Sequence, residues 1–70
     1  MFNYNEFKAA MQEKGHTVRK NGKYITVIPY NGDKGFLYAR DVISGFEDFL
    51  TVLWYDHYNT TIFKVRCKIK

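Results

Sequence analysis

The last eight residues of the chain alternate strictly between apolar and basic side chains. They read Phe63-Lys64-Val65-Arg66-Cys67-Lys68-Ile69-Lys70. Neighbouring side chains of an extended strand point to opposite faces, so this pattern predicts a strand with one apolar face and one basic face. Such a strand fits a sheet that is buried on one face and open to solvent on the other. The basic face is the strongest functional signal in the sequence, because it favours an anionic partner.

Length and composition limit the core that this sheet can build. The chain has 70 residues, which is the size of one small domain, here residues 1–70. Aromatic residues make up 19% of the chain, with six Tyr and six Phe. A domain of this size cannot bury all of them. Some aromatic side chains are therefore expected at a homodimer interface or at a partner site.

The first element is predicted to be a helix over residues 4–14. Asn3 is a suitable N-cap, and Glu6 stands three residues later, as in a capping box. Phe2 and Phe7 are spaced as a hydrophobic staple. Gly15 fits the left-handed position that follows a helix. The buried stripe of this helix is expected to consist of Tyr4, Phe7, Ala10 and Met11.

A β-hairpin is predicted around Asn21-Gly22, the pair that type I′ turns prefer. A two-residue loop would place Arg19 opposite Tyr24. One face of the hairpin would then point toward the helix with Val18, Ile25 and Val27. The other face would carry Arg19, Tyr24, Thr26 and Ile28.

The middle of the chain allows more than one interpretation. Residues 36–40 are interpreted as a third strand, and residues 49–55 as a fourth, because Thr51, Val52, Trp54 and Tyr55 favour strand. Residues 41–48 are ambiguous, since Asp41 is able to cap a short helix that Gly45 would end. A single helix over residues 41–55 is the alternative. Residues 61–69 form the last strand.

The fold class expected from these elements is α+β, with one N-terminal helix packed on an antiparallel sheet of four to five strands. One helix covers only one face of such a sheet. The uncovered face is expected to carry Arg19, Tyr24, Lys64 and Arg66. The register between the strands does not follow from the sequence.

The net positive charge of the chain indicates which kind of partner this uncovered face would bind. The chain has 11 Lys and Arg against 7 Asp and Glu, a net charge of +4. Lysine and arginine neutralise phosphates and aromatic rings stack on bases, so one hypothesis is a nucleic-acid-binding module that uses a basic, aromatic sheet face for RNA or DNA. The alternative is that these side chains protect an edge strand against aggregation. On the first hypothesis the face binds through Arg19, Tyr24, Lys64, Arg66 and Lys68.

A second hypothesis is a protein-binding inhibitor or adaptor. Tyrosine and tryptophan anchor protein interfaces. Tyr30 and Tyr58 lie in predicted loops and are expected to be exposed, whereas Trp54 is expected in the core. On this hypothesis Tyr30 and Tyr58 join the partner-binding residues.

No catalytic constellation is apparent, so we expect a protein that is not an enzyme and that has no cofactor and no metal. His57 beside Asp56 supplies only two ligands, and no spaced His, Cys or Glu completes a site. The single cysteine, Cys67, lies on the apolar face of its strand and forms no internal disulfide. The sequence shows no signal segment and no membrane-spanning run, which predicts a cytoplasmic protein with no membrane partner.

The beginning of the chain contains Asn5-Glu6-Phe7 and then Lys14-Gly15-His16-Thr17-Val18-Arg19-Lys20-Asn21-Gly22, about a third of the chain in all. This stretch resembles small phage anti-CRISPR proteins that inhibit Cas9, which open with a short helix, a Lys, an aromatic residue, a Thr-Val pair and a turn glycine before an antiparallel sheet. It implies a phage or mobile-element protein that inhibits a host protein or nucleoprotein complex by occupying a surface, in the host cytosol. The member that it resembles is strongly acidic and mimics DNA, whereas this chain is basic. A basic protein of this class would engage guide RNA or an acidic protein surface instead.

Overall fold

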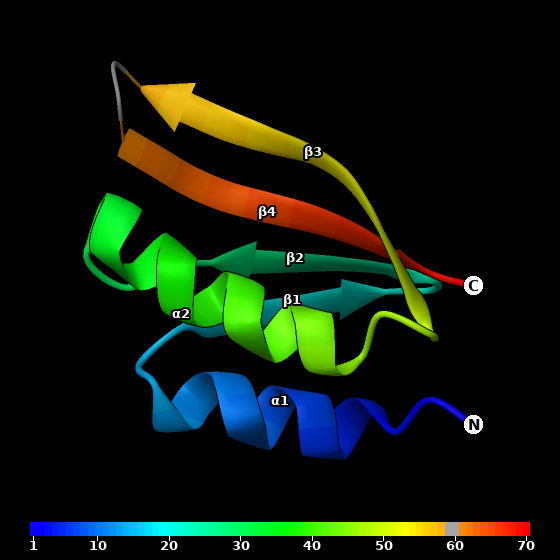
Figure 1. Cartoon of the computed structure of the whole chain (residues 1–70). Coiled ribbons are helices and arrows are strands. Elements are labelled where there is room, and N and C mark those ends of the chain that lie inside the picture. The colour runs from blue at the N-terminus through cyan, green and yellow to red at the C-terminus, as the bar shows by residue number, and fades with distance from the viewer. Residues whose placement is uncertain (59–60) are drawn as a thin grey trace.

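The computed structural model describes residues 1–58 and 61–70, with the side chains at 32, 33, 57, 58 and 61–63 left aside. Two helices and four strands follow one another along the chain (Figure 1). Their order is α1 (Tyr4–Glu13), β1 (Thr17–Asn21), β2 (Tyr24–Ile28), α2 (Gly32–Gly45), β3 (Leu50–Tyr58) and β4 (Thr61–Ile69). The α+β class and the four-stranded antiparallel sheet are confirmed.

The sheet order is β1-β2-β4-β3, so the last strand of the chain lies inside the sheet. Helix α2 carries the chain from β2 past one strand position to β3, and β4 then fills the gap between them. β4 pairs antiparallel with both β2 and β3. The interpretation of its basic side chains as protection of an edge strand is therefore wrong, because the edges of this sheet are β1 and β3.

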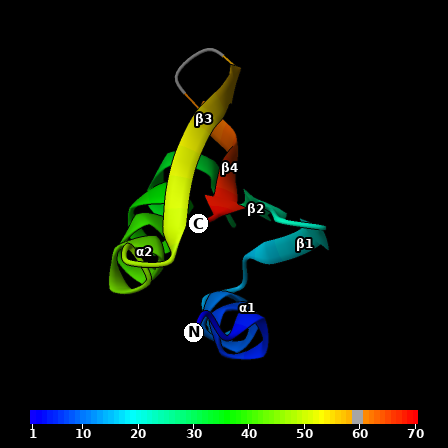
Figure 2. The same ribbon diagram turned by 90° about the vertical axis from the view of Figure 1, so that its right-hand side faces the viewer.

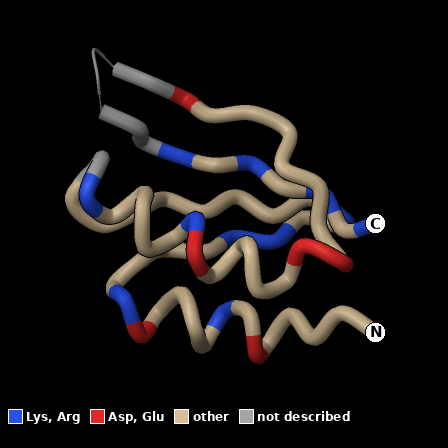
Figure 3. The backbone as a smooth tube through the Cα atoms, in the orientation of Figure 1, with Lys and Arg blue, Asp and Glu red and all other residues tan. Residues whose placement is uncertain are grey.

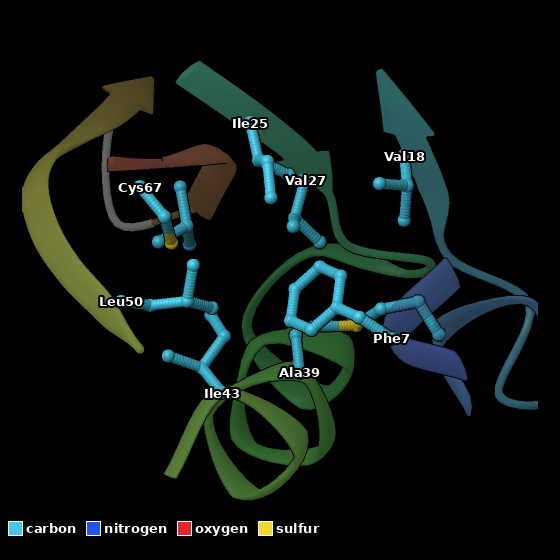
Figure 4. Close-up of a cluster of buried hydrophobic side chains, with 10 residues drawn as sticks. Phe7, Val18, Ile25, Val27, Ala39, Ile43, Leu50 and Cys67 are labelled. Atoms are coloured by element: carbon cyan, nitrogen blue, oxygen red, sulfur yellow. The ribbon is translucent and has the colours of Figure 1, made fainter. Parts of the chain in front are cut away.

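Both helices cover the same face of the sheet, α1 against β1 and α2 against β4 (Figure 2). Apolar side chains from both helices and from all four strands meet between the two layers (Figure 4). Val65 and Cys67 of β4 are fully buried there, and Ile69 is partly buried, as the alternation predicts. Among the described residues, no helix lies over the opposite face of the sheet. The described core side chains that are buried are Phe7, Met11, Val18, Ile25, Val27, Ala39, Ile43, Leu50, Val65 and Cys67.

A second helix replaces the predicted third strand, and this is the main correction to the fold. Residues 36–40 belong to α2, which ends at Gly45 as one interpretation allowed, and Asp41 lies inside the helix rather than at its cap. The aromatic residues near position 37 suggested strand. The helical spacing of Gly35, Ala39 and Ile43, all buried, is what places this segment against the sheet. Residues 41–55 are thus helix first and strand from Leu50 onward.

The β1–β2 hairpin forms with a register two residues away from the predicted one. Arg19 faces Thr26 and Asn21 faces Tyr24, so the loop is Gly22-Lys23. Gly22 has a φ of 62° and is the loop residue with positive φ, which corresponds to a type II′ turn with glycine first rather than the expected type I′. A shift of two residues keeps every side chain on its predicted face.

Helix α1 follows its sequence signals. The Asn3 side chain accepts a hydrogen bond from the Glu6 backbone N–H at 3.1 Å. The rings of Phe2 and Phe7 lie 5.7 Å apart, as a hydrophobic staple requires. Gly15 takes the left-handed conformation, with φ at 87°. These local contacts fix where the helix begins and ends.

Candidate nucleic-acid interface

The uncovered side of the sheet, here called the outer face, is a grid of side chains from all four strands. The strand registers align Arg19, Thr26, Arg66 and Trp54 in one row across the sheet, in the order β1, β2, β4 and β3. The neighbouring row contains Asn21, Tyr24, Lys68 and Thr51. Strands are spaced about 4.8 Å apart, so each row is roughly 14 Å long. The face thus interleaves cations, hydroxyl or amide groups and aromatic rings.

Cations lie directly over the aromatic rings of this face. The Arg66 guanidinium carbon is 4.8 Å from the centre of the Tyr24 ring, and the Lys68 Nζ is 5.8 Å from the same ring. The Lys64 Nζ lies 5.9 Å from the centre of the Trp54 ring. Tyr24 and Trp54 each keep 38% of their surface exposed. The outer face can therefore present flat π surfaces and positive charge within the same few ångströms.

Arg66 is the central member of the face. A shallow depression of about 420 Å³ opens beside it, lined by Arg19, Lys20, Asn21, Tyr24, Thr26 and Arg66. The Arg66 Nε is buried and has no hydrogen-bond partner in the described part of the chain. A buried donor without a partner costs free energy. An anion that enters the depression would meet the positive charge of Arg19 and Arg66, whereas the Lys20 ammonium lies near the Tyr4 ring.

Only some of the basic residues in the alternating segment Phe63–Lys70 are free to meet such an anion. Lys64 pairs with Asp56 of β3 at 3.6 Å, and both side chains are partly exposed. Within the described residues, Arg19, Arg66 and Lys68 form no ion pair. Lys70 lies beyond the end of β4, where its Nζ donates to the Glu47 carbonyl oxygen at 3.1 Å. The free positive charge is thus concentrated at the end of the outer face next to the β1–β2 turn, on β1 and β4.

Most acidic residues lie with the helices, which also carry basic residues, whereas the strands are mostly basic (Figure 3). Segments 1–16 and 29–49, which contain the helices, hold six acidic and four basic residues. Segments 17–28 and 50–70, which contain the strands, hold seven basic residues and one acidic residue, Asp56. An anionic partner would therefore meet an attractive field on the sheet side.

Five of the seven residues predicted to bind a partner come together on the outer face: Arg19, Tyr24, Lys64, Arg66 and Lys68. Tyr30 does not. It follows β2, lies against Gly15, and lines a separate depression of about 160 Å³ with Lys14, Lys34 and Tyr38. Tyr58 is at the end of β3, and its side chain lies outside the described residues.

Sequence reasoning missed three residues of this face, namely Asn21, Thr51 and Trp54. Trp54 was expected in the core but lies outward on an edge strand. The reason is a bulge in β3: Val52 faces Cys67 and Trp54 faces Arg66, which leaves Leu53 without a partner on β4. An extra residue reverses the faces of all residues beyond it. The strand-forming character of residues 51–55 was a visible signal, whereas the bulge was not.

Two titratable side chains lie in the core layer, away from the outer face. His16 is 3% exposed, and its Nδ1 accepts a hydrogen bond from the Tyr30 backbone N–H at 3.0 Å. Burial, and secondarily the nearby charge of Lys14, lower the pKa of His16 below its usual value of 6.5. Burial raises the pKa of the Cys67 thiol to about 11. Neither group is exposed to a partner.

No group of three His, Cys, Asp or Glu side chains among the described residues is arranged to hold a metal ion. None of the described helices has the length and apolar character needed to cross a membrane. The chain matches no protein-family model, no curated protein and no solved structure.

Proposed function

We propose that this chain is a non-catalytic binding protein whose outer face binds single-stranded nucleic acid. The observation that supports the proposal is the position of β4. Its cations stand on a central strand, where edge protection cannot explain them, and they lie beside exposed aromatic rings. A solvent-exposed sheet face is ordinarily polar, so the proposal rests on the combination of these cations with exposed aromatic rings and not on charge alone.

Single strands suit this face better than a duplex does. The aromatic rings that interleave the cations would stack on bases, and only unpaired bases offer their faces. Stacking contributes about 1–3 kcal/mol per base. The cations Arg19, Arg66 and Lys68 would contact phosphates, which position the strand without reading its sequence. The expected binding is therefore salt-dependent and tolerant of sequence.

Fluorescence anisotropy with short labelled RNA, single-stranded DNA and duplex DNA tests this proposal. We expect both single strands to bind and the duplex to bind more weakly. Trp54 is the only tryptophan, so its own emission reports stacking at the outer face. The absence of any anisotropy change at low ionic strength would refute the proposal.

Charge reversal on each layer provides a matched pair of variants. Arg66→Glu removes the central cation of the outer face and is expected to weaken binding by about tenfold or more. Arg40→Glu makes the same chemical change on α2, where Arg40 is exposed on the helix layer. We expect it to change affinity by no more than about twofold. Equal losses in both variants would show that net charge alone, and not the outer face, controls binding.

The second candidate function is inhibition of a host nucleoprotein complex in the host cytosol, as the resemblance to anti-CRISPR proteins implies. The observation that favours it is a second exposed surface on the helix side, made by Tyr30, Leu37 and Tyr38. A protein with one surface for nucleic acid and another for protein could occupy a site on such a complex. Interference assays against several CRISPR subtypes test this candidate, with Leu37→Glu as the surface variant. Full interference in the presence of this protein in every subtype would exclude it.

A further inference from the structure

We propose that strand β3 pairs antiparallel with β3 of a second copy, which joins two sheets into one of eight strands. β3 is nine residues long, stands at an edge of the sheet (Figure 1), and pairs only with β4 in the part of the chain that the structure describes. An edge strand presents unpaired N–H and C=O groups that can accept another strand. This inference does not depend on binding of nucleic acid.

The two edges of the sheet differ in how they are protected. β1 is short, five residues, and carries Arg19 and Lys20, with Lys23 in the following turn. Two such edges would repel one another. β3 has no charged residue over positions 50–55, and the acidic residue that follows, Asp56, pairs with Lys64 of its own sheet. The bulge at Leu53 bends the strand, but β3 contains no lysine or proline that would prevent another strand from pairing with its edge.

Exposed apolar side chains follow the same unprotected edge. Val52 is 39% exposed and Leu53 is 42% exposed, and the two precede Trp54 in the strand. Consecutive exposed apolar residues on an edge strand are typical of an interface. Helix α2 packs chiefly against β4 and leaves this part of β3 with little cover.

A second copy is the occupant that the charges favour. Pairing β3 with a copy of β3 brings together two neutral segments and closes the assembly at two chains. Pairing β3 with a basic β1 edge would give an open chain of molecules, and the one acidic residue of β3, Asp56, already pairs with Lys64 of its own sheet. A two-fold axis perpendicular to the sheet relates antiparallel edges, so both outer faces would lie on one side and form a continuous surface.

Sedimentation equilibrium without nucleic acid tests the dimer. We expect the apparent mass to rise from 8.3 kDa toward twice that value between about 5 and about 500 micromolar, as for a small interface. Leu53→Lys places a charge on the edge and is expected to raise the dissociation constant by about tenfold or more. Ala9→Lys adds the same charge at an exposed position of α1 and is the control.

Three results would overturn this proposal. They are a constant monomer mass at every concentration, a dimer that Leu53→Lys leaves unchanged, and growth beyond two chains. Far-ultraviolet circular dichroism of each variant verifies folding, and the concentration series of the unmodified protein stands even if a variant fails to fold. Anisotropy of Leu53→Lys with labelled RNA distinguishes failure of the dimer from failure of nucleic-acid binding. A monomeric variant should still bind the RNA, but with lower affinity, because only one outer face then contacts each RNA strand.

Discussion

Gly35 is the residue on which the placement of α2 depends most directly. Its backbone lies so close to Tyr30 that a Cβ at this position would overlap the Tyr30 carbonyl oxygen. A backbone atom cannot move aside as a flexible side chain can. We expect Gly35→Ala to lower the free energy of unfolding by about 3 kcal/mol, a large share for a domain of this size. Urea unfolding followed by circular dichroism measures the loss.

Gly45, in the last turn of the same helix, is the matched control. A Cβ there would meet no atom within 4 Å, and its φ is not positive. Since alanine favours helix over glycine by roughly 0.5–1 kcal/mol, Gly45→Ala should leave stability unchanged or raise it slightly. If both variants lost stability equally, the close approach of Gly35 to Tyr30 would not be the cause.

His16 should make stability depend on pH. Its pKa in the folded state is lowered by burial and by Lys14, so the folded protein favours neutral imidazole, whose Nδ1 accepts from the Tyr30 N–H. The unfolded chain binds a proton more readily, near its usual pKa of 6.5. The stabilising contribution is therefore complete above pH 6.5 and is lost as pH falls through the lowered pKa. Urea midpoints at about pH 7.5 and about pH 5.5 should show this loss.

His16→Asn isolates this effect, because an asparagine side-chain oxygen can also accept from a backbone N–H but does not titrate. The variant is expected to be less stable at neutral pH, since it fills less of the core, and to lose less stability on acidification. A loss equal to that of the unmodified chain would assign the pH dependence to other groups.

Among the elements, helix α1 shows how much one local signal, its N-cap, contributes to the free energy of unfolding. Its cap is a single hydrogen bond from the Glu6 N–H to the Asn3 side chain. We expect Asn3→Ala to cost about 1 kcal/mol of unfolding free energy, and Asn3→Asp to retain most of it, because aspartate is an equally good cap. Asn5→Ala, at an exposed position inside the helix, should be neutral or stabilising. Thermal unfolding of the three variants measures the difference.

Elements with local signals could be predicted from the sequence, and those that depend on distant contacts could not. Helix α1 and strand β4 were predicted within a residue of their ends, because a cap and a strict alternation define them. The first part of helix α2 was missed, because Phe36 and Tyr38 favour strand locally, whereas a short helix that Gly45 would end was one of the interpretations.

For the outer face, too, some features could be predicted from local signals and others could not. The alternation of β4 and the parity of the hairpin predicted which side chains share a face, even where the hairpin register was wrong by two residues. The place of β4 between β2 and β3 did not follow from the sequence, because it depends on how the connection through α2 folds back over the sheet. That position excludes edge protection as the reason for the basic side chains of β4.

At the scale of the whole molecule, the fold places most of the negative charge with the helices and most of the positive charge with the sheet. The two layers share one core, so the polarity of the molecule is fixed by the fold and does not depend on flexible side chains. Long-range attraction would orient an approaching anion toward the outer face, and salt would weaken it. The number of free cations on that face then sets how steeply binding responds to salt.

Three unpaired cations, Arg19, Arg66 and Lys68, predict a slope of about −2 for the logarithm of the binding constant against the logarithm of salt concentration with a single strand. Asp56→Asn releases Lys64 from its ion pair, so it should tighten binding and steepen the slope by about 0.7. Lys64→Gln should change the slope little, because that charge is already balanced. Salt titrations of the three proteins by anisotropy give these slopes. An unchanged slope in Asp56→Asn would mean that the strand does not reach the β3 side of the outer face, and binding would then be confined to the depression around Arg66.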